Sequence, residues 1–116
     1  MIYLASPYSG TREEQIERHF QAMVCCAALF RKGLWVVSPI VHWHEVAHRF
    51  NLGSDVMAFK AYCHSLLTVC SSLYILQIDG WDHSVGVANE IQDAKQLGKN
   101  IMAVVPNGYK YNIEQF

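Results

Sequence analysis

The residue best suited to carry out chemistry is a glutamate near the start of a predicted helix. Glu90 follows the small-residue segment Ser84-Val85-Gly86, which places it in the first two turns of a helix expected over residues 85–97. The helix dipole favours the ionised carboxylate, the form that a nucleophile or a general base needs. A glutamate in a first turn is also a favourable helix charge, so position alone leaves both interpretations open.

A second polar group, residues 6–12, lies between the first apolar run and the first predicted helix. The hydroxyls of Ser6, Tyr8 and Ser9 and the guanidinium of Arg12 surround a helix N-terminus, where free N–H groups favour a phosphate or a carboxylate. The same hydroxyls can simply cap the helix or complete the turn. Neither GxGxxG nor GxxxxGK is present, which argues against dinucleotide and P-loop sites.

The segment 44–48 matches HExxH, in which two helical histidines bind zinc and the glutamate activates water. A zinc hydrolase with His44 and His48 as ligands is therefore one alternative. The metzincin continuation is absent, because Asn51 stands where its glycine is required. His42 is awkwardly placed to complete a tetrahedron. Surface or crevice histidines are the other interpretation, and we expect no metal and no organic cofactor.

These residues must be positioned by alternating strands and helices. Apolar runs predict strands over 2–5, 34–37, 73–78 and 101–105, with helices between them over about 12–32, 42–50, 54–69 and 85–97. The third of these helices has Ser54 and Asp55 as its expected cap. The alternation predicts an α/β fold, a doubly wound, flavodoxin-like or Rossmann-like parallel sheet of four to five strands with helices on both faces.

The first helix is the best defined element in the sequence. Thr11 followed by Glu14 forms a capping box, and Gly33 is a typical helix stop. Apolar residues recur at spacings of three and four, which predicts a stripe that faces the core. The members of this stripe are Ile16, Phe20, Met23, Ala27 and Phe30.

Ligands of parallel α/β sheets bind in the crevice beyond the carboxyl ends of the strands. The three most polar loops, 6–12, 38–44 and 79–90, leave strands at this edge, so we expect them to build one site. Trp43 and Trp81 are aromatic residues in or near these loops. Their rings can stack on a base or close a pocket, although a tryptophan in a short loop often just covers core.

Length and composition favour one domain, residues 1–116, that binds a small molecule. A chain of 13.2 kDa buries one core, and a net charge of −1 gives no basic footprint for a nucleic-acid polymer. No apolar run approaches the roughly 18 residues of a membrane span, and no export signal is evident. The four cysteines lack CxxC spacing, which favours reduced thiols and a cytoplasmic location.

With these residues in place, the chain resembles the nucleoside 2-deoxyribosyltransferase superfamily, and within it a bacterial and phage subfamily described as a domain of unknown function. The matching segments run in order along nearly the whole chain. They are Ile2-Tyr3-Leu4-Ala5-Ser6-Pro7-Tyr8-Ser9, Gly33 through Ser38-Pro39-Ile40, Gly80-Trp81-Asp82, Ser84-x-Gly86-x-x-x-Glu90, Ala94 and Gly98-Lys99.

The resemblance implies an N-glycosidase or a transferase in which Glu90 attacks C1′ of a nucleoside or nucleotide and expels the base. Tyr3 would hydrogen-bond and orient that carboxylate. Ser84 stands where the transferases carry aspartate and the nucleoside monophosphate hydrolases carry serine, which implies a 5′-phosphorylated substrate. The substrate-binding residues expected from the loops and the resemblance are Ser6, Pro7, Tyr8, Ser9, Arg12, His42, Trp81, Ser84 and Gly86.

The chain departs from the superfamily pattern at the group that protonates the leaving base. Cys63 stands at the usual aspartate, beside His64, and Ser71 replaces a second aspartate. Either His64 or Asp82 takes over the acid role, or catalysis is altered or lost. A nucleotide-binding module without catalysis is therefore a further alternative. The resemblance also implies a homodimer or a higher homo-oligomer, and it leaves the base, the sugar and the acceptor open.

Overall fold

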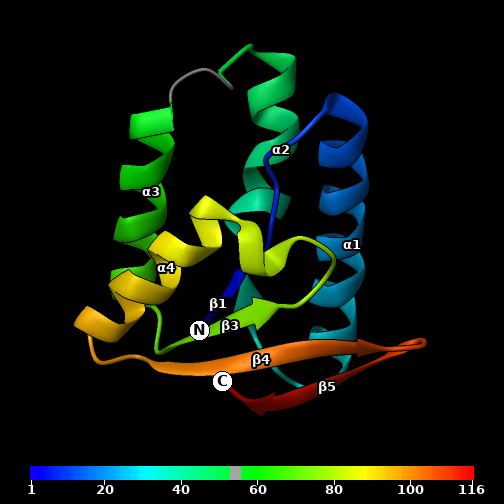
Figure 1. Ribbon diagram of the computed structural model, residues 1–116, viewed down its shortest axis with the longest axis vertical. Coiled ribbons are helices and arrows are strands. Elements are labelled where there is room, and N and C mark those ends of the chain that lie inside the picture. The colour runs from blue at the N-terminus through cyan, green and yellow to red at the C-terminus, as the bar shows by residue number, and fades with distance from the viewer. Residues whose placement is uncertain (53–55) are drawn as a thin grey trace.

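Strands and helices alternate along the computed structural model, which describes residues 1–52 and 56–116 (Figure 1). The strands are β1 (Ile2–Ala5), β2 (Val36–Val37), β3 (Ser72–Leu76), β4 (Asn100–Asn107) and β5 (Lys110–Gln115). The helices are α1 (Arg12–Arg31), α2 (Pro39–Arg49), α3 (Val56–Val69) and α4 (Val85–Gln96), with one turn of 3-10 helix, η1 (Trp81–His83), before α4.

The five strands form one mixed sheet in the order β2-β1-β3-β4-β5. β1 is parallel to β2 and β3, and β3 is parallel to β4, whereas β5 runs antiparallel to β4. The α/β prediction is thus confirmed, but the expectation of a wholly parallel sheet is wrong at the β5 edge. Only Gly108 and Tyr109 separate β4 from β5, and so short a connection can join only antiparallel strands.

Side chains alternate across the sheet and divide the core into two halves. One half joins Tyr3 and Ile75 to Leu67 of α3 and Val87 of α4. The other half joins β1, β3 and β4 to Cys25 and Leu29 of α1, among others. Helices therefore pack against both faces of the sheet, as Figure 1 shows.

Helix α1 begins as predicted but turns a different face toward the sheet. Thr11 Oγ1 accepts a hydrogen bond from the Glu14 amide at 3.2 Å, and Glu14 Oε1 accepts one from the Thr11 amide at 2.9 Å. The buried side chains are Ala22, Cys25 and Leu29.

The predicted core stripe of α1 is instead exposed, and Phe20 and Phe30 are 58% and 69% accessible. The second half of α1 is apolar on every side, so periodicity does not choose a face. Small residues at 22 and 25 let the helix lie close to the sheet, where larger ones would not fit.

Helix α2 starts three residues earlier than predicted. Ser38 is its N-cap, with its Oγ accepting from the Val41 amide at 3.1 Å, and Pro39 takes the first helical position, where the missing N–H costs nothing. The expected cap of α3, Ser54 and Asp55, lies outside the described residues. Within residues 1–52 and 56–116, every helix is too short or too polar to span a bilayer.

Candidate functional site

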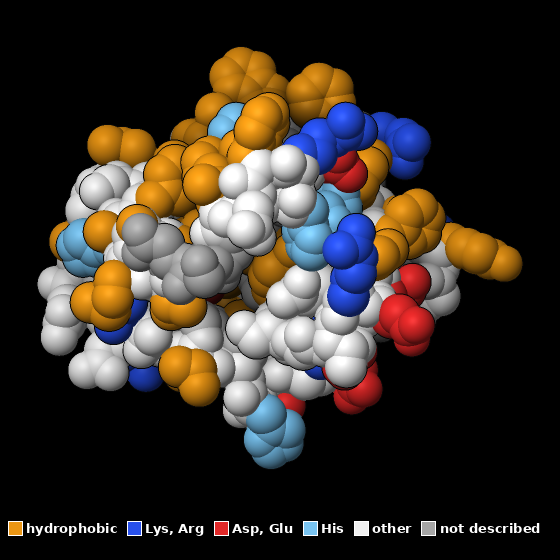
Figure 2. Space-filling model, turned by 90° about the horizontal axis from the view of Figure 1, so that it is seen from above, with side chains coloured by type: hydrophobic (Ala, Val, Ile, Leu, Met, Phe, Trp, Pro, Cys, Tyr) orange, Lys and Arg blue, Asp and Glu red, His pale blue; other side chains and the backbone are white. Residues whose placement is uncertain are grey.

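A cavity of about 380 Å³ opens beyond the carboxyl end of β1, with walls from α2, α3 and the start of α4. Its volume lies in the range of small-molecule sites. Figure 2 looks onto this end of the molecule and shows hydrophobic side chains gathered over α2 and α3, with Lys, Arg and His toward α1. The predicted crevice and this cavity coincide at Ser6, Tyr8, Ser9, Ser84, Gly86 and Glu90.

Glu90 lines the cavity and is held by a tyrosine from the sheet. Tyr3, which is fully buried on β1, donates a hydrogen bond from its hydroxyl to Oε2 of Glu90 on α4. Burial raises the pKa of the Glu90 carboxyl to about 7, while the bond from Tyr3 opposes that rise. Burial and the charge of Glu90 raise the pKa of Tyr3. The tyrosine therefore keeps its proton while the carboxyl changes charge near neutral pH.

The Cys63 thiol lies beside the same tyrosine hydroxyl. A side-chain interaction with Cys63 contributes to the raised pKa of Tyr3, and burial raises the pKa of the Cys63 thiol to about 11. Such a thiol is neutral at physiological pH and is a weak acid. Cys63 thus places a neutral thiol beside the Tyr3 hydroxyl.

His64 and Asp93 connect α3 to α4 at the rim of the cavity. The His64 Nδ1 and Asp93 Oδ2 atoms are 3.1 Å apart, and both residues line the cavity. The charge of Asp93 also contributes to the raised pKa of Glu90. Sequence reasoning selected His64 but missed Asp93, although Asp93 follows Glu90 by three residues and so shares its helix face.

The polar end of the cavity is the part of its wall that is lined by Ser6 and by Ser84 and Gly86 at the start of α4. Ser6 is buried, and its Oγ has no hydrogen-bond partner among the described residues. Ser84 caps α4, since its Oγ accepts from the Val87 amide at 3.2 Å. The first-turn amides of α4 and the open position Gly86 lie at the same wall. A buried hydroxyl without a partner is costly, so this end is suited to an oxygen-rich anion.

Arg18 of α1 ties together the two loops at this end of the sheet. Its guanidinium donates to the Ser9 carbonyl oxygen. It also lies so close to Gly80 that a Cβ there would meet Nη2 at 2.8 Å, and Gly80 has a φ of +91°. The left-handed backbone favours glycine at position 80, and a side chain there would also displace the Arg18 guanidinium. The role of Arg18 in joining these loops could not be predicted from the sequence, because a position in the middle of a helix gives no local signal.

Tyr8 belongs to a group of histidines beside the cavity. Its hydroxyl lies 2.5 Å from Nδ1 of His44 and 3.0 Å from Nε2 of His48, and the His44 ring stacks on His19 with centroids 4.1 Å apart. Burial lowers the pKa of His44. The Tyr8 hydroxyl therefore contacts two histidines of α2 and connects that helix to the loop after β1.

The glutamate of the HExxH segment points away from the two histidines, which meet at the Tyr8 hydroxyl. Glu45 pairs with Arg49 at the surface, at 2.7 Å, while His44 and His48 turn to Tyr8. Across the described part of the chain, no three His, Cys, Asp or Glu side chains are arranged to hold a metal ion. The geometry gives the zinc-hydrolase interpretation no support.

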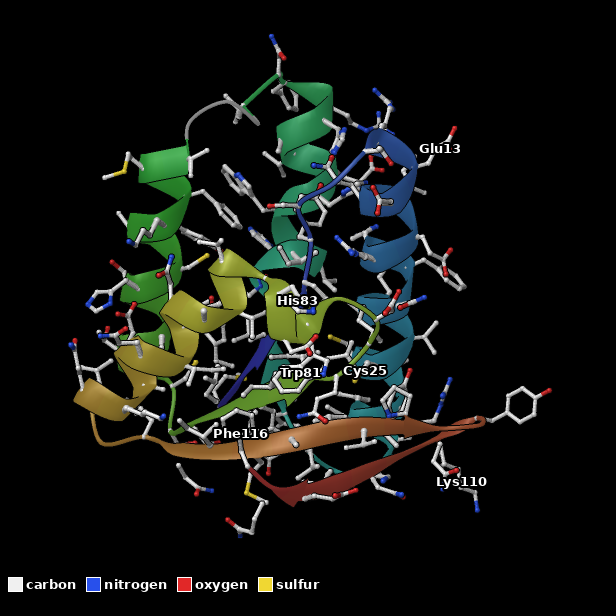
Figure 3. All side chains as sticks on the ribbon, in the orientation of Figure 1. Glu13, Cys25, Trp81, His83, Lys110 and Phe116 are labelled. Atoms are coloured by element: carbon white, nitrogen blue, oxygen red, sulfur yellow. The ribbon has the colours of Figure 1, made fainter. Side chains whose placement is uncertain are left out.

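The remaining predicted site residues do not line the cavity. Trp81 packs edge to face on Phe116, with centroids 6.0 Å apart, as Figure 3 shows. Asp82 is exposed, and its Oδ2 atom lies 3.9 Å from Nε2 of His83. Both residues belong to η1, which follows the left-handed Gly80 and turns their side chains away from the cavity. Two others, Arg12 and His42, are exposed, and Pro7 is buried.

Comparisons with known proteins match the chain at the level of a family. The family described as "Domain of unknown function (DUF1937)" matches residues 1–105, a range that contains every residue lining the cavity. The search of curated proteins gives no match. Because the match covers most of its length, the chain belongs to the DUF1937 family.

Proposed function

We propose that this protein is an N-glycosidase-like enzyme that removes or transfers the base of a nucleoside 5′-monophosphate, with Glu90 as nucleophile. One observation carries the proposal: the Glu90 carboxyl, held by Tyr3, shares a cavity with the unpartnered hydroxyl of Ser6. The proposal has three further parts. The protein is related to the nucleoside 2-deoxyribosyltransferase superfamily, its fold is a doubly wound sheet with β5 added at one edge, and it is located in the cytoplasm.

The reaction follows from a carboxylate opposite the leaving base. The ionised Glu90 oxygen attacks C1′, the C1′–N bond breaks, and its electron pair leaves with the base. The positive charge that develops on the sugar is stabilised by the same carboxylate, as in retaining glycosidases. Water or a second base then attacks C1′ of the glycosyl-enzyme and frees Glu90.

The phosphate is assigned to the polar end of the cavity. Helix N-termini favour phosphate because their amides and their dipole point positive charge at it. A phosphate oxygen there gives the Ser6 hydroxyl the partner that it lacks, next to Ser84 and Gly86. The apolar wall formed by Ile40, Trp43 and Phe59 at the other side is suited to the flat base.

The first experiment incubates the protein with a panel of ribo- and deoxyribonucleoside monophosphates and measures free base by chromatography. We expect release from at least one, with release from the unphosphorylated nucleoside much slower. Glu90→Gln should lower kcat by roughly 10³-fold or more. Glu13→Gln is the matched control, because Glu13 is exposed on α1 and projects away from the cavity (Figure 3). Silence of the wild-type protein across the panel refutes the proposal.

The second candidate function is nucleotide binding without turnover. The observation that favours it is Cys63, whose neutral thiol stands where an acid is usual. Calorimetry on the same panel separates the two functions. Micromolar binding of a monophosphate without base release supports the binding module, and base release dependent on Glu90 excludes it.

A further inference from the structure

We propose that His64 is the acid that protonates the leaving base and that Asp93 is the residue that positions it. This inference rests on the proposed function and deepens it at one step. A base that leaves as an anion is a poor leaving group, so its departure is accelerated when a nearby group supplies a proton.

The other candidate donors at the site are unsuited to this step. The Cys63 thiol has a pKa raised to about 11, and the Tyr3 proton is held by Glu90. Asp82, the alternative from the sequence, is exposed outside the cavity. The His44 imidazole is hydrogen-bonded to Tyr8, and burial lowers its pKa.

His64 lies on the cavity wall and has one ring nitrogen held by a carboxylate. It lines the cavity with its side chain half exposed, and Asp93 accepts from Nδ1 at 3.1 Å. That bond leaves Nε2 as the free ring nitrogen, without a partner in the described part of the chain. The charged or titratable groups around it are Asp93 and Glu90 on α4 and Lys60 and Cys63 on α3.

Asp93 acts through His64. Its carboxylate accepts the hydrogen bond from Nδ1 and so fixes the ring orientation, in the manner of the carboxylate in a catalytic triad. Its place on α4, one turn after Glu90, sets the positioning residue and the nucleophile on one rigid element, while the acid lies on the neighbouring α3. The His64 proton passes to a ring nitrogen of the base as the C1′–N bond breaks. When water attacks C1′, its proton returns to His64.

The alternative role for the pair is to hold α3 against α4. A contact between two partly exposed side chains adds little to stability, and such a contribution affects every substrate equally. The acid role instead depends on the leaving group, because a stable anion leaves without a proton. This difference separates the two roles.

The test uses two substrates, the nucleoside monophosphate that the panel selects and a 4-nitrophenyl furanoside 5-phosphate with the same sugar. His64→Gln should lower kcat on the nucleotide by roughly 10²–10⁴-fold with KM nearly unchanged. On the nitrophenyl substrate the variant should stay within a few-fold of wild type. Asp93→Asn should show the same pattern with a smaller loss, and Glu90→Gln should be inactive on both.

His83→Gln is the matched control, since His83 is exposed on η1 and lies outside the cavity (Figure 3). Thermal melts verify folding, and His64→Asn replaces His64→Gln if the latter is unstable. Equal losses on both substrates, or no loss on the nucleotide, overturn the acid assignment and leave the glycosidase intact. A wild-type protein inert on both substrates overturns the proposed function itself.

Discussion

Glu90 shows how a single residue can be made reactive at some expense of stability. Burial raises the pKa of its carboxyl from 4.5 to about 7, so the folded protein binds a proton more tightly than the unfolded chain does. The free energy of unfolding therefore falls as pH rises from about 4.5 to about 7 and stays lower above that range. This conflict between charge and burial is typical of functional sites.

The pH dependence of catalysis follows from the same residue. The nucleophile must be ionised, so kcat/KM should rise with pH through about 7. Tyr3→Phe removes the hydrogen bond that lowers the Glu90 pKa, and should move this ascending limb to higher pH. Rate profiles between pH 5 and 9 test this, with exposed Tyr109→Phe as control. A limb near pH 4.5, or one unmoved by Tyr3→Phe, contradicts the assignment.

Individual site residues were predictable where a local motif specifies them. The resemblance selected Glu90, Tyr3 and Ser84, and the structure brings these residues to one end of the sheet. It misplaced Trp81 and Asp82, because the path of their loop depends on Gly80 and on Arg18, which is distant in sequence. Asp93 was missed because its partner, His64, lies on another helix.

At the scale of elements, α4 contributes three parts of the proposed site. These are its share of the polar end of the cavity, the proposed nucleophile and the proposed positioning residue. Gly86 is in its first turn, and an added Cβ would meet only Ser84 Oγ, at 3.8 Å. Gly86→Ala should therefore leave the melting temperature unchanged or slightly higher, because alanine favours helix by up to about 1 kcal/mol. The same methyl group narrows the polar end of the cavity, so KM for the nucleotide should rise severalfold.

Gly98→Ala is the matched control for that variant. Gly98 ends α4 with a φ of +69°, a conformation that costs alanine about 1–2 kcal/mol. Its melting temperature should fall while its KM stays constant. A Gly86→Ala protein with unchanged KM would place the phosphate elsewhere.

Element types were easier to predict than the faces and edges they present. The cap at Thr11 and the stop at Gly33 are local chemistry, and α1 begins and ends close to where these residues predict. The buried face of α1 depends on how closely a helix can approach this sheet. The pairing of β5 depends on the neighbouring strand β4. The buried face of α1 and the pairing of β5 therefore cannot be predicted from the sequence of either segment alone.

At the scale of the whole molecule, we propose that the protein self-associates through α1. Its exposed apolar stripe, with Ile16, Phe20, Met23 and Phe30, runs the length of the helix, and contiguous apolar surface of this kind marks interaction sites. Light scattering should give a mass above 13.2 kDa. Phe20→Asp should reduce it to the monomer, whereas Val69→Asp on α3 should not, although Val69 is apolar and more exposed than Phe20. A monomeric wild type contradicts this prediction.

The hydrogen bond between Tyr3 and Glu90 connects helix α4 to the interior of the sheet. Tyr3 belongs to β1, an interior strand, and its ring is part of the core below the cavity. The reactive carboxyl is thus aligned from beneath by the scaffold, and no surface loop can release it independently. Partial unfolding of the sheet therefore releases this group, whereas movement of a surface loop leaves its alignment unchanged.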